Sequence, residues 1–87
     1  MHTTQGFWHI FKDYPVLDED ENELYKLQGR CYLDVDYEID KLGKVETIER
    51  ITDSRGNELK DFKLYAEALE AMEELERMNE ITKGEYL

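Results

Sequence analysis

The segment CYLDVDYEID, residues 31–40, alternates apolar and acidic side chains. Its acidic members are Asp34, Asp36, Glu38 and Asp40, and no basic residue lies between them. Closely spaced carboxylates can bind a metal ion, act as an acid–base pair, or present negative charge to a cationic surface. The choice among these chemistries depends on which other groups of the chain can join them.

A second acidic cluster, DEDENE at residues 18–23, resembles the start of a calcium-binding loop. Its first, third and fifth residues, Asp18, Asp20 and Asn22, have side-chain oxygens of the kind that bind calcium in such loops. The sixth position, which requires glycine, is Glu23, and the twelfth, which should be glutamate, is Gly29. One cysteine and two histidines are too few for a tetrahedral zinc site. We therefore expect no metal and no cofactor.

The pairing of Cys31 with His9 is the one nucleophile–base combination worth considering. Cys31 falls on the apolar side of the alternation, which favours a small buried thiol over a reactive one. The chain has no glycine-rich phosphate loop, and carboxylates on a solvated strand face lack the pocket that would separate their pKa values. We expect no catalytic residue and a protein that is not an enzyme.

The chain carries 22 Asp and Glu against 11 Lys and Arg, a net charge of −11. This charge repels nucleic acid and anionic lipid, so we expect neither direct nucleic-acid binding nor membrane association, but attraction to a basic protein. The length of 87 residues fits one domain, residues 1–87, and 40% apolar residues suffice for one small core. With no leader and an unpaired cysteine, we expect a complete cytoplasmic protein.

Three strands and one helix are expected to position these side chains. The strands are predicted at residues 7–16, 24–40 and 45–52, the helix at 61–80, with 1–6 frayed and the tail 81–87 unassigned. We favour a solvated loop at 18–23 over the first turn of a short helix, and turns at KLGK and DSRGNE. Gly29 predicts a bulge or bend in the second strand. The spacing of Val45, Ile48 and Ile51 indicates a bulge, or two partly buried faces, in the third.

Residues 61–80 place apolar side chains on one half of a helix and mostly acidic ones on the other. Asp61 is a plausible N-cap. We expect Leu69, Met72 and Leu75 to pack on the sheet, and Lys63 to pair with Glu67. The predicted fold class is α+β, a three-stranded antiparallel β-meander with one C-terminal amphipathic α-helix packed on the sheet.

The alternation places the four carboxylates of residues 31–40 on the outer face of a strand, about 6.6–6.8 Å apart. A solvent face explains why they are polar, but mixed surfaces usually interleave basic residues. Together with the acidic cluster they could present spaced anions to a protein that normally grips phosphates. The residues expected to bind such a partner are Asp34, Asp36, Glu38, Asp40, Asp18, Glu19, Asp20 and Glu21.

The acidic strand YLDVDYEID, the turn-bounded VETIERITDSRGNEL and the acidic helix give residues 24–80 a resemblance to small acidic strand-plus-helix proteins of bacteriophages and prophages. Several such families inhibit host defence nucleases, and some mimic DNA. The resemblance implies a binding protein that occupies or inhibits a basic, nucleic-acid-handling partner. The alternative is a structural homodimer whose acidity serves only solubility, with an interface at Phe7, Trp8 and Ile10 because these side chains fall on both faces of a short strand.

Overall fold

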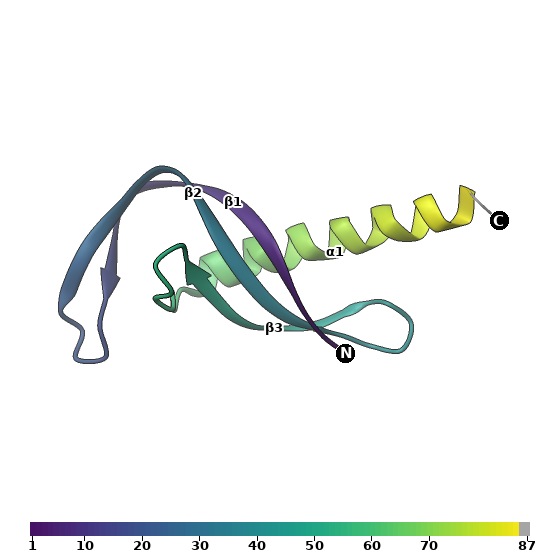
Figure 1. Ribbon diagram of the computed structural model, residues 1–87, viewed down its shortest axis with the longest axis horizontal. Coiled ribbons are helices and arrows are strands. Elements are labelled where there is room, and N and C mark those ends of the chain that lie inside the picture. Colours follow the sequence, from purple (N-terminus) through teal and green to yellow (C-terminus); the bar gives the residue numbers. More distant parts are fainter. Residues whose placement is uncertain (86–87) are drawn as a thin grey trace.

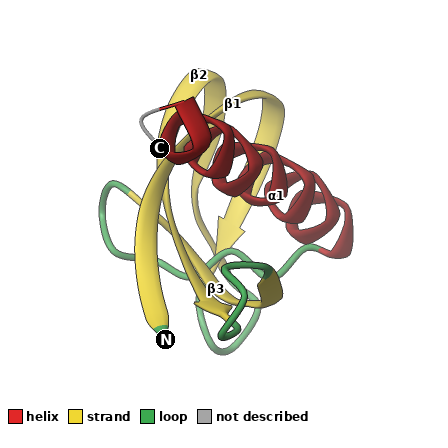
Figure 2. Cartoon of the chain, turned by 90° about the vertical axis from the view of Figure 1, so that its right-hand side faces the viewer, coloured by secondary structure: helices red, strands yellow, loops and turns green. Residues whose placement is uncertain are grey.

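The computed structural model describes the backbone of residues 1–85 and the side chains of residues 1–78. Its elements are β1 (His2–Leu17), β2 (Glu23–Ile39), β3 (Val45–Asp53) and α1 (Phe62–Glu85). The strands form one antiparallel sheet in the order β1-β2-β3 (Figure 1). Figure 2 shows α1 lying along one side of this sheet. The predicted α+β meander with a C-terminal helix is therefore confirmed.

Strand β1 begins earlier than the sequence suggested. Residues 2–6 pair with residues 34–38 of β2, and the carbonyl oxygen of Met1 accepts the N–H of Ile39 at 2.9 Å. The prediction that residues 1–6 are frayed is wrong. The long β2 strand has backbone N–H and C=O groups along its whole length that need hydrogen-bond partners, and residues 2–6 supply them. The β-branched side chains of Thr3 and Thr4 favour the strand conformation.

The β1–β2 ribbon bends sharply near its middle, as Gly29 predicted. The register slips where two residues of β1, Lys12 and Asp13, stand opposite Gln28 alone. Asp13 and Gly29 both have positive φ, of 48° and 71°. Because this bulge curls the ribbon, its far end turns back over the segment that follows β3 (Figure 1), and Val16 joins the core.

Two bulges in β3 explain its irregular spacing. Glu49 and Glu46 are each an extra residue between successive pairs with β2. Each extra residue changes the repeat from two to three, so Val45, Ile48 and Ile51 all face the core. The bulge interpretation of this strand is confirmed.

Helix α1 presents a narrow buried stripe to the sheet. Leu64, Ala68 and Met72, spaced four apart, are fully buried, whereas Leu69 and Leu75 are only half-buried and lie outside the core cluster. The prediction is thus correct for Met72 and wrong in giving Leu69 and Leu75 the same role. The reason is the helix orientation: α1 packs chiefly against β3, so the buried stripe lies to one side of the apolar half.

Both ends of α1 can be compared with the prediction. The side chain of Asp61 accepts the backbone N–H groups of Lys63 and Leu64 at 2.9 and 3.3 Å, which confirms it as the N-cap. The helix continues to Glu85, five residues beyond the predicted end at residue 80. The segment 81–85, which had no assignment, is therefore helical.

Three loops of the sheet are built in the same way. Their sequences are DEDEN (18–22), DKLGK (40–44) and DSRGN (53–57). In each, the first aspartate accepts the backbone N–H groups two and four residues later, at 2.8–3.0 Å. The fourth position is left-handed: Glu21 at φ 65°, Gly43 at 82° and Gly56 at 86°. The loop favoured at 18–23 and both predicted turns are confirmed.

Candidate functional site

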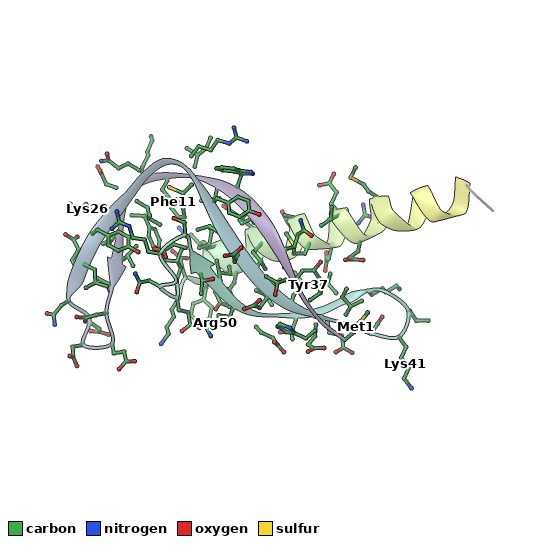
Figure 3. All side chains as sticks on the ribbon, viewed as in Figure 1. Met1, Phe11, Lys26, Tyr37, Lys41 and Arg50 are labelled. Atoms are coloured by element: carbon green, nitrogen blue, oxygen red, sulfur yellow. The ribbon has the colours of Figure 1, made fainter. Side chains whose placement is uncertain are left out.

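Asp34, Asp36 and Glu38 lie on the outer face of β2, opposite the face that α1 covers; we call these three residues the carboxylate row. The intervening residues of β2 are buried in the core beneath α1. One of them, Tyr37, which is labelled in Figure 3, donates a hydrogen bond to Glu76 of α1 at 3.0 Å. The alternation in the sequence therefore assigned the two faces of this strand correctly.

The N-terminal end of the chain holds the row in place. Thr4 Oγ1 donates to Asp36 Oδ1 at 2.5 Å, and the α-ammonium group of Met1 lies 3.1 Å from Glu38 Oε2. The His2 Nε2 atom lies 3.5 Å from Glu49 Oε2 on β3 and 3.9 Å from Asp36 Oδ1. These contacts hold the side chains of Asp36 and Glu38, and the Met1 ammonium group neutralises part of the charge of Glu38. The row is thus more ordered, and less negative, than three free carboxylates would be.

Asp40 does not belong to the row. Strand β2 ends at Ile39, and the side chain of Asp40 accepts the N–H groups of Leu42 and Lys44 at 2.8 and 2.9 Å. Asp18 has the same loop-closing role at the other end of the β1–β2 ribbon. Both were expected to bind a partner, but the structure gives each an internal role.

The other three residues of the acidic cluster that were expected to bind a partner, Glu19, Asp20 and Glu21, are exposed at the tip of the β1–β2 ribbon. This tip and the carboxylate row occupy opposite ends of the long β2 strand (Figure 1). The structure therefore does not bring the two predicted sets of carboxylates into one surface.

An aromatic patch adjoins the row on the same outer face; we define it as Trp8, Ile10 and Tyr32, whose exposed fractions are 54%, 74% and 43%. The Trp8 and Tyr32 rings meet edge to face at 4.9 Å, and the Arg30 guanidinium lies 4.4 Å from the centroid of Trp8. Tyr32 lies across Gly6, where any Cβ would overlap its ring.

Sequence reasoning missed Tyr32 and Arg30, although a signal was present. Their even-numbered positions continue the face on which Asp34 lies. Phe7, by contrast, was expected to join Trp8 and Ile10 in an interface, but it points to the opposite face and packs against the core. The three predicted interface residues therefore do not share a surface.

Cys31 and His9 stand opposite each other in the β1–β2 register, yet their side chains have other partners. The thiol of Cys31 donates to the carbonyl oxygen of Gln28 at 3.7 Å, and His9 Nδ1 lies 3.1 Å from Glu67 Oε2. This contact joins β1 to α1. The structure records it in place of the Lys63–Glu67 pair expected within the helix.

A cavity of about 260 Å³ lies between the β2–β3 loop and α1. Lys44 and Arg77 line it together with Glu73 and Glu76, so its charges are mixed.

Burial, followed by the hydrogen bond to Glu76, raises the pKa of Tyr37 to about 12. Tyr37 therefore acts as a hydrogen-bond donor at neutral pH and not as a base.

Metal binding and membrane insertion can be assessed for the part of the chain that the structure describes. Within it, no three His, Cys, Asp or Glu side chains are grouped so that they could hold a metal ion. In the calcium-like segment, Asp18 Oδ1 already accepts two backbone N–H groups. No helix in the same residues is both long and apolar enough to cross a membrane.

Comparison with known proteins gives no match to any family model, curated protein or solved structure. The resemblance to acidic phage proteins therefore rests on residues 24–80 alone.

Proposed function

We propose that this protein is a non-enzymatic binding protein that occupies the nucleic-acid-binding surface of a basic partner. The observation that carries the proposal is the carboxylate row, which lies on the sheet face that α1 leaves uncovered. Side chains two residues apart on a strand are about 6.6–6.8 Å apart, so the row presents regularly spaced negative charge. Proteins that bind nucleic acid place Lys and Arg to neutralise phosphates, and the row offers such a surface a complementary charge.

The contacts around the row favour this use. Thr4 and the Met1 ammonium group hold two of its carboxylates, so less side-chain entropy is lost when a partner binds. Glu49 adds a further carboxylate beside His2. The free Cys31 suits a reducing compartment, so we place this activity in the cytoplasm. The resemblance to acidic phage proteins favours a host nuclease as the partner class.

A charge-matched pair of variants tests the proposal. Asp36→Asn with Glu38→Gln removes two charges from the row. Glu70→Gln with Glu74→Gln removes two from the exposed face of α1 and serves as control. Immobilised wild-type protein first captures basic proteins from a bacterial lysate, and each captured protein is then bound to labelled duplex DNA.

The wild type and the helix variant should displace the DNA, whereas the row variant should need about tenfold more protein, because charges desolvated at an interface contribute most to binding. Displacement by the wild type should weaken as salt rises. Equal displacement by both variants at low and high salt would contradict the proposal, provided that their melting temperatures match the wild type.

The exposed aromatic patch favours a second candidate function, a structural homodimer whose acidity serves only solubility. Trp8 and Tyr32 are residue types that concentrate in the centres of protein interfaces, and here their rings meet edge to face and are exposed. Under this candidate, neutralising the row would change no binding reaction with another protein.

A further inference from the structure

Strand β1 forms an edge of the sheet, and its first part lacks the features that usually prevent edge pairing. Residues 1–11 contain no Asp, Glu, Lys or Arg in a chain that is 38% charged. Edge strands are normally protected by charged residues, proline or bulges. In β1 these begin only at Lys12, the bulge at Asp13 and Pro15. We call residues 3–11 the charge-free edge.

The backbone of the charge-free edge is available for pairing. In an antiparallel strand about half of the residues direct both N–H and C=O away from the neighbouring strand. Among the described residues, no backbone hydrogen bond outside the β2 ladder involves residues 3–11. Helix α1 packs chiefly on β3 and reaches β1 through the Glu67–His9 pair. Phe7 and His9 consequently remain only half-buried.

We propose that the charge-free edge pairs antiparallel with the same edge of a second copy of this chain, about a two-fold axis at Phe7. This register pairs residue 3 with residue 11 of the other copy, so every pair lies within the charge-free edge. It also preserves the two faces of the sheet, because Trp8 then stands opposite Gly6 and Ile10 opposite Thr4 of the second copy. The result is a continuous six-stranded sheet.

The distribution of charge favours pairing with a second copy in this register, because it keeps the carboxylates of the two copies apart. Two chains of net charge −11 repel each other wherever their carboxylates approach. Residues 3–11 contain no carboxylate side chain, so two copies can meet there without this repulsion. Thr4, which donates a hydrogen bond to Asp36, stands opposite Ile10 of the second copy. In that second copy, Ile10 in turn pairs with Arg30 of β2. The carboxylate row of each copy therefore aligns with the apolar and basic part of the other, and the two rows do not face each other.

Ile10 and Leu42 provide a matched test, because both are aliphatic side chains with nearly equal exposed fractions, 74% and 73%. Ile10 lies in the proposed interface and Leu42 in the remote β2–β3 loop. In sedimentation equilibrium the wild type should be a dimer. Ile10→Glu places a carboxylate near Asp36 of the other copy and should raise the dimer dissociation constant by about tenfold or more. Leu42→Glu, with the same change in charge, should leave it unchanged.

The sign of the charge provides a second test. Ile10→Lys places a cation near Asp36 of the other copy, about two strand spacings or 10 Å away, close to the Debye length at 0.1 M salt. At low salt it should dimerise at least as well as the wild type and clearly better than Ile10→Glu. Leu42→Lys should resemble Leu42→Glu. A purely steric or hydrophobic role for Ile10 predicts equal losses for both Ile10 variants.

Hydrogen exchange of the unaltered protein tests the same edge without mutation. Amide groups of residues 3–11 that point away from β2 should exchange more slowly as protein concentration rises, while those of the β2–β3 loop should not change. The proposal is overturned if the wild type sediments as a monomer up to its solubility limit. It is also overturned if Ile10→Glu and Leu42→Glu dimerise equally, or if these amides are protected only by a different protein.

Discussion

Replacing Asp53 with alanine should destabilise the protein far more than the same replacement at Asp18 or Asp40. All three aspartates close loops of one geometry, each accepting two backbone N–H groups. They differ in their surroundings, since Asp53 is 3% exposed and its second carboxylate oxygen accepts the Tyr25 hydroxyl. That hydroxyl in turn accepts Asn57 Nδ2 at 2.8 Å. Asp53 therefore ties the curled end of the β1–β2 ribbon to the loop after β3.

The magnitudes follow from what water can replace. At the two exposed loops, solvent reaches the freed N–H groups, so each substitution should cost about 1 kcal/mol, as for a lost helix cap. At Asp53, each buried donor left without a partner costs about 1–3 kcal/mol. Three donors lose their acceptor there, namely the two backbone N–H groups and the Tyr25 hydroxyl. We expect a total loss of about 3–5 kcal/mol for Asp53→Ala, a large share of the stability of a small domain.

Urea titration followed by tryptophan fluorescence measures these free energies of unfolding, with Tyr25→Phe as a control that removes only the hydroxyl contact. Tyr25→Phe should lose about 1 kcal/mol. Equal losses for the three aspartate variants, or a loss below about 1.5 kcal/mol at Asp53, would refute the argument that burial makes this loop different.

Three further predictions concern single side chains. Glu21→Gly should raise the free energy of unfolding by about 0.5–1 kcal/mol in thermal melts, because glycine adopts the left-handed conformation without strain; no gain would mean that the loop is unstrained. The pKa of Tyr37 is raised from 10.0 to about 12, so its contribution to stability is full below pH 10 and lost as pH rises toward 12. Tyr37→Phe should therefore flatten the fall in melting temperature over that range, and an unchanged slope would contradict this cause. Met72→Ala should cost about 2–5 kcal/mol in urea titration and Leu69→Ala clearly less, whereas the reverse order would place the wrong stripe of α1 against the sheet.

The sequence predicted the sheet and the helix because their periods are local properties. Leu33 and Val35 alternate with acidic residues, and a period of two places them on one face. The bulges of β3 could also be inferred, since Ile48 and Ile51 fit no strict alternation. The loop sequences even contain a repeated pattern, an aspartate followed three residues later by glycine at Gly43 and Gly56. Recognising that pattern would have identified Asp40 and Asp53 as structural residues, but not Asp18, whose loop has Glu21 in place of the glycine.

Other features depend on tertiary contacts that no local pattern contains. Residues 2–6 are polar and short of apolar side chains, and they form a strand only because β2 extends beside them. The position of α1 over β3 decides that Ala68 is fully buried and Leu69 only half-buried. The sequence places Phe7 and Trp8 on opposite faces of one strand, but it does not show that Phe7 packs against the core while Trp8 stays exposed.

The carboxylate row and the charge-free edge respond to charge in opposite ways, which allows one variant to separate them. The carboxylate row would bind a basic partner through its negative charge, whereas the charge-free edge would bind a second copy despite it. The Asp36→Asn, Glu38→Gln variant removes two negative charges from each chain and reduces repulsion between copies. It should therefore weaken the displacement of DNA from a basic partner and strengthen, or leave unchanged, the dimer seen in sedimentation. A parallel loss of both reactions would show that the substitutions disturb β1 through Thr4 and Met1, and it would contradict the independence of the two surfaces.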